Sequence, residues 1–239
     1  STPIKSSAAS DVYKRQTYMR MLRSIYNRGV DMHQAPYVHG LFRDVFTGVD
    51  TRQKKAIPIS ELHMLLNKDP QSEKLRRTQA IANLLFQFCG MPFSDLAHLE
   101  KSNLERGLLK YNRTKTGTPM SIEVLESAQN AIGGLYNKSD ARSSGYPDYL
   151  FRILSGAYKR NEEGAYREYQ SVLRRFNNEL KSLSRKLRLH SPVTSYTLRH
   201  SWATTAKYRG VPIEMISESL GHKSIKTTQI YLKGFELEE

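Results

Sequence analysis

The side chains best suited to chemistry lie close together, between Thr194 and Leu232 of the 239-residue chain. An arginine presents a planar fork that matches two phosphate oxygens, and a histidine can donate to developing negative charge. A tyrosine can attack as a phenolate and form a covalent ester. The candidates are Tyr196, Arg199, His200, His222 and Tyr231. This combination of residue types indicates chemistry on a phosphate group.

Three short helices are expected to position these side chains. Tyr196 and Arg199 are three residues apart, so on a helix they would share one face. Pro212 suits the first turn of a second helix and Gly221 suits its C-terminal cap, because an apolar stripe at helical spacing lies between them. His222 would then lie at a corner between two helices.

Three segments of this stretch resemble the signature of the tyrosine recombinases, the phage integrase family. They are LRHSWAT, SLGHKS and TTQIYL, and they occur in the family's order. Arg199 precedes His222 by 23 positions, and His222 precedes Tyr231 by 9, which fits the family spacing. The resemblance implies an α+β fold, mainly helical with a small antiparallel β-hairpin or sheet. It also implies site-specific recombination of double-stranded DNA by a phage or mobile-element integrase, with a homo-tetramer assembled on the DNA.

The resemblance assigns a role to each matching residue. Tyr231 would attack the scissile phosphate and form a 3′-phosphotyrosyl bond, while Arg199 clamps the phosphate and His222 donates to it. The family also carries a catalytic lysine on a hairpin, and RTKTG places Lys115 in a tight turn between two expected strands, RGLLKYNR and TPMSIEVL. Lys115 is the expected acid for the leaving 5′ oxygen. No metal or other cofactor is expected, because side-chain cations can supply the field.

Each of these residues also has an ordinary structural interpretation. Taken alone, Tyr231 would pack against its neighbours, Arg199 would form a surface ion pair, and His222 would satisfy the end of the preceding helix. The joint spacing of the three residues favours the functional interpretation. It does not do so for His200 or Trp202, which are expected to be structural.

Two departures from the family pattern affect the expected site. Tyr196 replaces the first histidine of an H-x-x-R box, and its phenol can hydrogen-bond a phosphate but is a poor base near neutral pH. In CGMPFSDL, Pro92 takes the usual place of an arginine, and Cys89 stands where some relatives carry it. Asp95 matches the acidic residue of that turn. Four arginines are candidates to compensate, and the sequence does not choose among them: Arg76, Arg77, Arg106 and Arg113.

These departures leave two rival hypotheses open beside the recombinase. One is a DNA-binding relative of the same fold whose catalysis is weakened. The other is a relaxing enzyme of the type IB topoisomerase kind, which would also use a phosphotyrosyl intermediate but would need no particular site.

Composition favours a polyanionic partner. Lys and Arg outnumber Asp and Glu by 37 − 23, which gives a net charge of +14, and such an excess most simply serves nucleic acid. No apolar run is long enough to cross a bilayer, and no signal peptide is visible. The single Cys89 cannot form an internal disulfide, and no Cys/His spacing suggests zinc. A bacterial cytoplasm is the expected location, at the nucleoid when DNA is bound.

The chain is expected to divide into three parts. Residues 1–16 are interpreted as a disordered or artefactual end, and 17–52 as the C-terminal remnant of a helical core-binding domain, with a helix over 17–30, plus a linker. Residues 57–239 are the expected catalytic domain. The expected DNA contacts are Lys54 and Lys55 in the linker, Arg113, and Arg174 and Arg175 on a long helix. The alternative for that helix is a solvated basic rim.

The rest of the expected catalytic domain is mainly helical. Helical spacing predicts helices over 60–66, 72–89, 124–135 and 164–187, and a short helix within GMPFSDLAHLEKSNL. Ser60 and Ser94 are the candidate N-caps of the first and the short helix.

Overall fold

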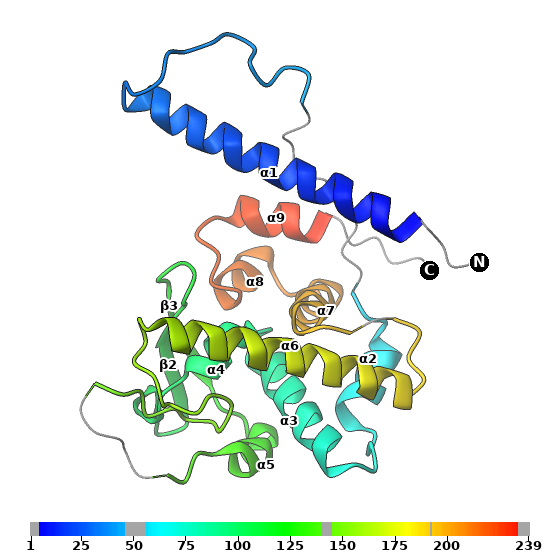
Figure 1. Ribbon diagram of the computed structural model, residues 1–239. Coiled ribbons are helices and arrows are strands. Elements are labelled where there is room, and N and C mark those ends of the chain that lie inside the picture. The colour runs from blue at the N-terminus through cyan, green and yellow to red at the C-terminus, as the bar shows by residue number, and fades with distance from the viewer. Residues whose placement is uncertain (1–4, 46–55, 140–144, 192, 234–239) are drawn as a thin grey trace. The chain divides into compact units, whose positions relative to one another are not determined.

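The computed structural model describes residues 5–45, 56–139, 145–191 and 193–233, and the side chains of 5–14, 230, 231 and 233 lie outside that description (Figure 1). Contacts divide the chain into two units, Ser1–Arg52 and Gln53–Glu239. Lys54 and Lys55, predicted to contact DNA, lie outside the described residues. Within the described residues, no helix combines the length and apolar character needed to cross a membrane.

The first unit consists of α1 (Lys5–Asp31) and the segment that follows it. The Tyr26 hydroxyl donates to the Pro36 carbonyl at 2.8 Å and accepts from the Val38 amide at 2.6 Å, which folds that segment back onto the helix. The helix begins at Lys5, so the start predicted at Thr17 is wrong. The polar run before Thr17 contains no proline or glycine from Lys5 onward, and nothing in it ends a helix.

The second unit is built around α3 (Glu73–Gln87). This helix contacts α2 (Ile59–Asn67), α5 (Glu126–Leu135), α6 (Glu163–Lys186) and α7 (Ser195–Tyr208) (Figure 1). Its apolar C-terminal half carries Leu84 and Leu85, which are fully buried in the main core. The helices predicted over 60–66, 72–89, 124–135 and 164–187 are therefore confirmed, with bounds that differ by a few residues.

Two helices of the second unit are preceded by a proline, where the sequence predicted a serine cap. α2 begins at Ile59 after Pro58, and α4 (Phe93–His98) begins after Pro92. The N-caps predicted at Ser60 and Ser94 are therefore wrong, because both serines lie inside the first turn. A proline just before the first turn supplies a fixed φ and loses no hydrogen bond there.

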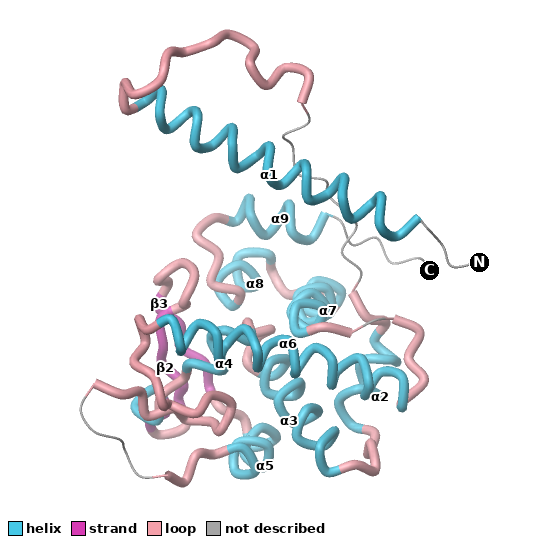
Figure 2. Tube along the Cα trace, in the orientation of Figure 1, coloured by secondary structure: helices cyan, strands magenta, loops and turns pink. Residues whose placement is uncertain are grey.

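A small antiparallel sheet follows the short 3-10 helix η1 (Lys101–Asn103). Its strands β1 (Leu104–Glu105), β2 (Leu108–Asn112) and β3 (Pro119–Glu123) lie in that order, and β2 and β3 are visible in Figure 2. Leu109 pairs with Ile122 and both are buried, so one face of the sheet joins the core. The predicted hairpin and its turn are confirmed. The two-residue β1 was not predicted because it is too short to show a period.

Three helices end the described chain, as predicted: α7, α8 (Ile213–Ser219) and α9 (Ile225–Lys233). They enclose a second, smaller apolar cluster formed by Ala203, Ala206, Ile216, Leu220 and Leu232. The Thr194 hydroxyl caps α7 by accepting from the Thr197 amide at 3.2 Å. The mainly helical α+β architecture is the one expected from the sequence.

Candidate active site

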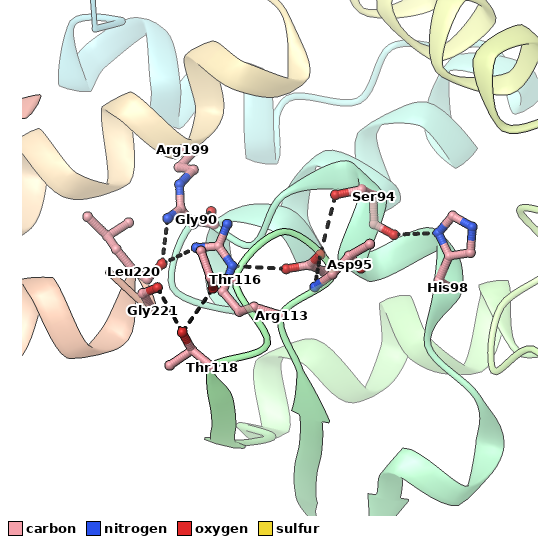
Figure 3. A network of polar contacts seen from close by, with 11 residues as sticks. Gly90, Ser94, Asp95, His98, Arg113, Thr116, Thr118, Arg199, Leu220 and Gly221 are labelled. Carbon is pink, nitrogen blue, oxygen red and sulfur yellow. Dashed lines mark hydrogen bonds and ion pairs between the residues drawn. The ribbon is translucent and has the colours of Figure 1, made fainter. Parts of the chain in front are cut away.

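Arg199 is fixed by two backbone carbonyls from distant segments. It projects from α7, is 5% exposed, and donates from Nη1 to the Gly90 carbonyl at 2.8 Å and from Nη2 to the Leu220 carbonyl at 2.6 Å (Figure 3). Both of these acceptors are neutral, so they orient the guanidinium without cancelling its charge. Such an orientation is what a phosphate clamp requires.

The turn before α4 approaches α7 through a glycine. Gly90 has φ +65°, and a Cβ there would lie 3.2 Å from the Arg199 Cα and 3.2 Å from the Trp202 Cβ. A side chain here would crowd α7 and would be strained at this φ, so glycine favours the close approach that delivers the Gly90 carbonyl to Arg199. The preceding Cys89 also lies in the left-handed region, with φ +55°, and burial raises the pKa of its thiol.

The corner between α8 and α9 is a Schellman motif. The Gly221 amide donates to the Glu218 carbonyl at 2.8 Å, and the His222 amide donates to the Ser217 carbonyl at 3.0 Å. Gly221 takes φ +62°, which confirms its predicted place just past the end of the helix. The motif sets the direction of the chain at His222, directly beside the Leu220 carbonyl that Arg199 holds.

Arg113 meets Arg199 at that same carbonyl. It follows β2, is 8% exposed, and donates from Nη1 to the Leu220 carbonyl (Figure 3). Its Nε lies 3.3 Å from Asp95 Oδ2 in a buried ion pair. Asp95 Oδ1 accepts from the Thr114 amide at 3.2 Å, so α4 and the hairpin turn are tied together. The sequence alone listed Arg113 as a DNA contact and as one of four compensating candidates.

His222 is held by a buried threonine of the next helix. Its Nδ1 lies 2.8 Å from Thr228 Oγ1, and Thr228 is fully buried. Burial, and after it the charges of Arg199, Arg113 and Lys115, together lower the pKa of His222 to about 4. His222 is therefore neutral near pH 7.

Lys115 lies in the exposed turn of the hairpin. The turn is closed by the Gly117 amide, which donates to the Arg113 carbonyl at 2.8 Å. Thr118 Oγ1 donates to the Gly221 carbonyl at 3.5 Å and lies 2.9 Å from Thr116 Oγ1 (Figure 3). The structure thus brings the predicted lysine turn beside the His222 corner.

Of the two tyrosines of the predicted site, Tyr196 has a described side chain and Tyr231 has a described backbone alone. Tyr196 is 49% exposed on α7, and its ring meets that of His200 edge-on at 4.4 Å between centroids. His200 is buried, as expected for a structural residue. The backbone of Tyr231 lies in α9, and its side chain lies outside the described part of the structure.

The remaining predicted residues are not brought to this cluster. Arg174 and Arg175 are exposed on α6. Within the described residues, no group of three or more His, Cys, Asp or Glu side chains could hold a metal ion. Sequence reasoning missed the roles of Thr228 and of the Gly90 and Leu220 carbonyls. A threonine six residues after His222, on a helix that follows a tight corner, was the available signal for the first of these.

Comparisons with known proteins show what this chain is similar to. The phage integrase family model matches residues 56–237. The chain is 29% identical over 204 residues to a probable integrase/recombinase protein of Methanocaldococcus jannaschii. The match covers 82% of this chain and 58% of that protein. It is 30% identical over 190 residues to the tyrosine recombinase XerD of Halalkalibacterium halodurans, at 75% and 57% coverage. The chain thus spans under two thirds of the length of these curated relatives.

Solved structures share the fold at low sequence identity. The Tn1549 transposon integrase in complex with a circular intermediate DNA matches with a TM-score of 0.61 and 17% identity. The match covers 97% of this chain and 82% of that one.

Proposed function

The chain belongs to the phage integrase family, and we propose that it is a site-specific DNA recombinase that cuts and rejoins DNA through Tyr231. The Tyr231 oxygen attacks the scissile phosphorus, and the bond to the 5′ oxygen breaks. The phenol loses its proton, the 5′ oxygen gains one, and the DNA is left as a 3′-phosphotyrosyl ester. Attack by a 5′ hydroxyl of another strand reverses these steps, so the bond energy is conserved.

The convergence of Arg199, His222 and the Lys115 turn on the Leu220–Gly221 corner is the observation that carries this proposal. Arg199, Arg113 and Lys115 contribute three positive charges and Asp95 one negative charge. With His222 neutral, the excess is 3 − 1 = 2 charges. A phosphodiester that gains charge on attack is the kind of group that such a site stabilises, because the donors are already in place.

The roles of the other side chains follow from their positions. Lys115 is exposed on a turn, where it can reach a leaving oxygen, and it donates the proton. His222 donates to a non-bridging oxygen as a neutral imidazole. Tyr196 lies on α7 one turn before Arg199 and contacts the phosphate through its phenol, without serving as a base.

Double-stranded DNA is the proposed partner, and four copies assemble on two DNA segments to complete strand exchange. The net charge of +14 supports the DNA partner, and the similar Tn1549 transposon integrase was solved in complex with DNA. The mechanism takes its electrophilic assistance from side chains, so covalent adduct formation is expected to persist in excess EDTA. We place the reaction in the cytoplasm of a bacterium that carries a phage or mobile element.

Covalent trapping tests the proposal. Repeats in the DNA that flanks the reading frame define the candidate site, and a nicked duplex of that sequence releases a short strand on cleavage, which blocks religation. The wild-type protein should give an adduct that survives denaturation, and Tyr231→Phe should give none. A wild-type protein that binds the site and forms no adduct would refute the recombinase and favour the DNA-binding relative that Pro92, Cys89 and Tyr196 suggest.

The same protein separates the recombinase from a relaxing enzyme. A recombinase forms its adduct only on duplexes that carry its site, whereas a type IB topoisomerase relaxes any supercoiled plasmid. Relaxation of a plasmid without the site, lost in Tyr231→Phe, would support the second activity instead.

A further inference from the structure

We propose that Arg113 supplies the second phosphate-binding guanidinium of this site, in place of the arginine that is absent at Pro92. This inference rests on the proposed function and adds a catalytic residue to it. Pro92 immediately precedes α4 with φ −63°, and its ring offers no donor. The acidic member of the same turn, Asp95, is still present and buried.

The structure separates Arg113 from the other three candidates. Arg76 forms an exposed ion pair with Asp69, with 3.0 Å between Nε and Oδ1. Arg77 donates to the carbonyl of Arg152. Arg106 is exposed in the turn between β1 and β2, at the opposite end of β2 from the Lys115 turn. Of the four, only Arg113 contacts the carbonyl that also holds Arg199.

Arg113 is held as a phosphate-binding arginine would be. Its Nη1 donates to the Leu220 carbonyl, to which Arg199 Nη2 donates at 2.6 Å, so the two guanidinium groups converge on one oxygen. Its Nε lies 3.3 Å from Asp95 Oδ2. The turn that lacks the arginine therefore still provides a carboxylate, and this carboxylate now orients an arginine from the hairpin (Figure 3).

The corner after α8 leaves room for the Arg113 side chain. A Cβ at Gly221 would collide with Arg113 Cδ and would lie 2.9 Å from Met120 Sδ. Gly221 is therefore required twice, for its positive φ in the Schellman motif and for the passage of the Arg113 stem. This packing fixes the guanidinium beside His222.

The charge of this arrangement calls for an anion. Two guanidinium groups that are buried and meet at one carbonyl oxygen repel each other in a medium of low dielectric constant. A phosphodiester would relieve that repulsion, and two forks can engage its two non-bridging oxygens. The ligand class is thus a phosphodiester whose charge grows during attack.

Substitutions of Arg113 test the inference when adduct formation is measured on two substrates, one with a normal scissile phosphate and one with a modified scissile phosphate. On the nicked duplex, Arg113→Ala should slow adduct formation on the order of 10²- to 10³-fold, while DNA affinity changes little. Arg113→Lys, which keeps the charge and the stem but loses the fork, should lie between wild type and Arg113→Ala. The matched control is Arg106→Ala, which removes an exposed arginine from the same sheet and should match wild type.

A methylphosphonate at the scissile position distinguishes a phosphate contact from a structural role. This group lacks the negative charge that Arg113 would neutralise, so the defect of Arg113→Ala and Arg113→Lys should shrink to within a few-fold of wild type on that substrate. Equal losses on both substrates, or no loss on the phosphodiester, would overturn the inference. A wild-type protein without any adduct would instead refute the proposed function, and this inference with it.

Discussion

Two pairs of arginines in the second unit illustrate different ways of meeting a phosphate. Arg113 and Arg199, the buried pair, are 8% and 5% exposed and are fixed by the Leu220 carbonyl. Arg174 and Arg175, the exposed pair, lie on the solvent face of α6. The first pair has its orientation set by the fold, whereas the second is exposed to solvent.

The difference in burial suggests that one pair acts in catalysis and the other in DNA binding. Exposed cations act through net charge, and salt screens their effect within roughly 10 Å. Buried cations are costly to desolvate, and their interaction with an anion is correspondingly stronger and less screened. We therefore expect the buried pair to control the rate of adduct formation, and the exposed pair to control affinity and its dependence on salt.

The largest effect is expected from Arg199→Ala. Removing this guanidinium deletes the phosphate clamp, takes its donor from the Gly90 carbonyl and leaves the Leu220 carbonyl with Arg113 in place of two donors. Adduct formation at saturating DNA should fall on the order of 10³-fold, and the free energy of unfolding should fall by about 1–3 kcal/mol. Single-turnover trapping and urea denaturation measure the two losses.

Arg199→Lys is the matched control for charge. It keeps a cation at α7 but cannot donate to both carbonyls at once, so its rate should stay close to that of Arg199→Ala. A Lys variant that cleaves at the wild-type rate would mean that charge alone suffices. The contrast between the buried and the exposed pair would then disappear.

How far the sequence predicted this contrast depends on the range of the contacts. Arg199, His222 and Lys115 were assigned from local motifs, and the C-terminal helices and the hairpin were predicted because their spacing is local. Arg113 could not be chosen among four arginines, because its decisive partner, the Leu220 carbonyl, is 107 residues away in sequence. A backbone acceptor also leaves no trace in residue identity.

The predicted starts of several helices were wrong for a different reason. Ser60 and Ser94 are good N-cap residue types, but the prolines before them start the helices earlier. The polar run from Lys5 shows no apolar period, and a helix formed there nonetheless. Propensity and capping rules rank alternatives, and packing or a rigid neighbouring residue decides between them.

The exposed pair should give an intermediate effect on DNA binding. In the double variant Arg174→Ala/Arg175→Ala, two fewer phosphates would be neutralised, so the slope of log affinity against log salt should become shallower by about 1.8. Adduct formation at saturating DNA should remain at the wild-type rate. Fluorescence anisotropy from low to moderate salt measures the slope.

A second double variant tests whether the loss of net charge alone explains the change in the salt slope. Arg106→Ala/Lys110→Ala also removes two exposed cations, here from the sheet, and should change the salt slope by less. Equal changes in both double variants would show that α6 is not a preferred contact. A slower adduct in the α6 variant would show that the exposed pair also acts in the chemistry.

The smallest expected effect is the response of His222 to acid. The pKa of His222 is lowered from 6.5 to about 4 in the folded protein, by burial first and then by the charges of Arg199, Arg113 and Lys115. Between these two values the unfolded chain binds the proton and the folded chain does not, so stability present above pH 6.5 is lost as the pH falls towards 4. Because the ring is half-buried and partly screened, we expect a loss of about 1–2 kcal/mol.

Urea denaturation at several pH values, compared with His222→Gln, isolates this loss, because all other groups titrate alike in both proteins. In the wild type the free energy of unfolding should fall further than in His222→Gln between pH 7 and pH 4. Adding Arg113→Ala removes one of the charges that lower the pKa of His222, and should reduce the difference. Adding Arg174→Ala/Arg175→Ala should leave the difference unchanged, since the charges that lower the pKa of His222 are those of Arg199, Arg113 and Lys115. If the α6 variant reduced the difference instead, His222 would be responding to overall charge rather than to the buried pair.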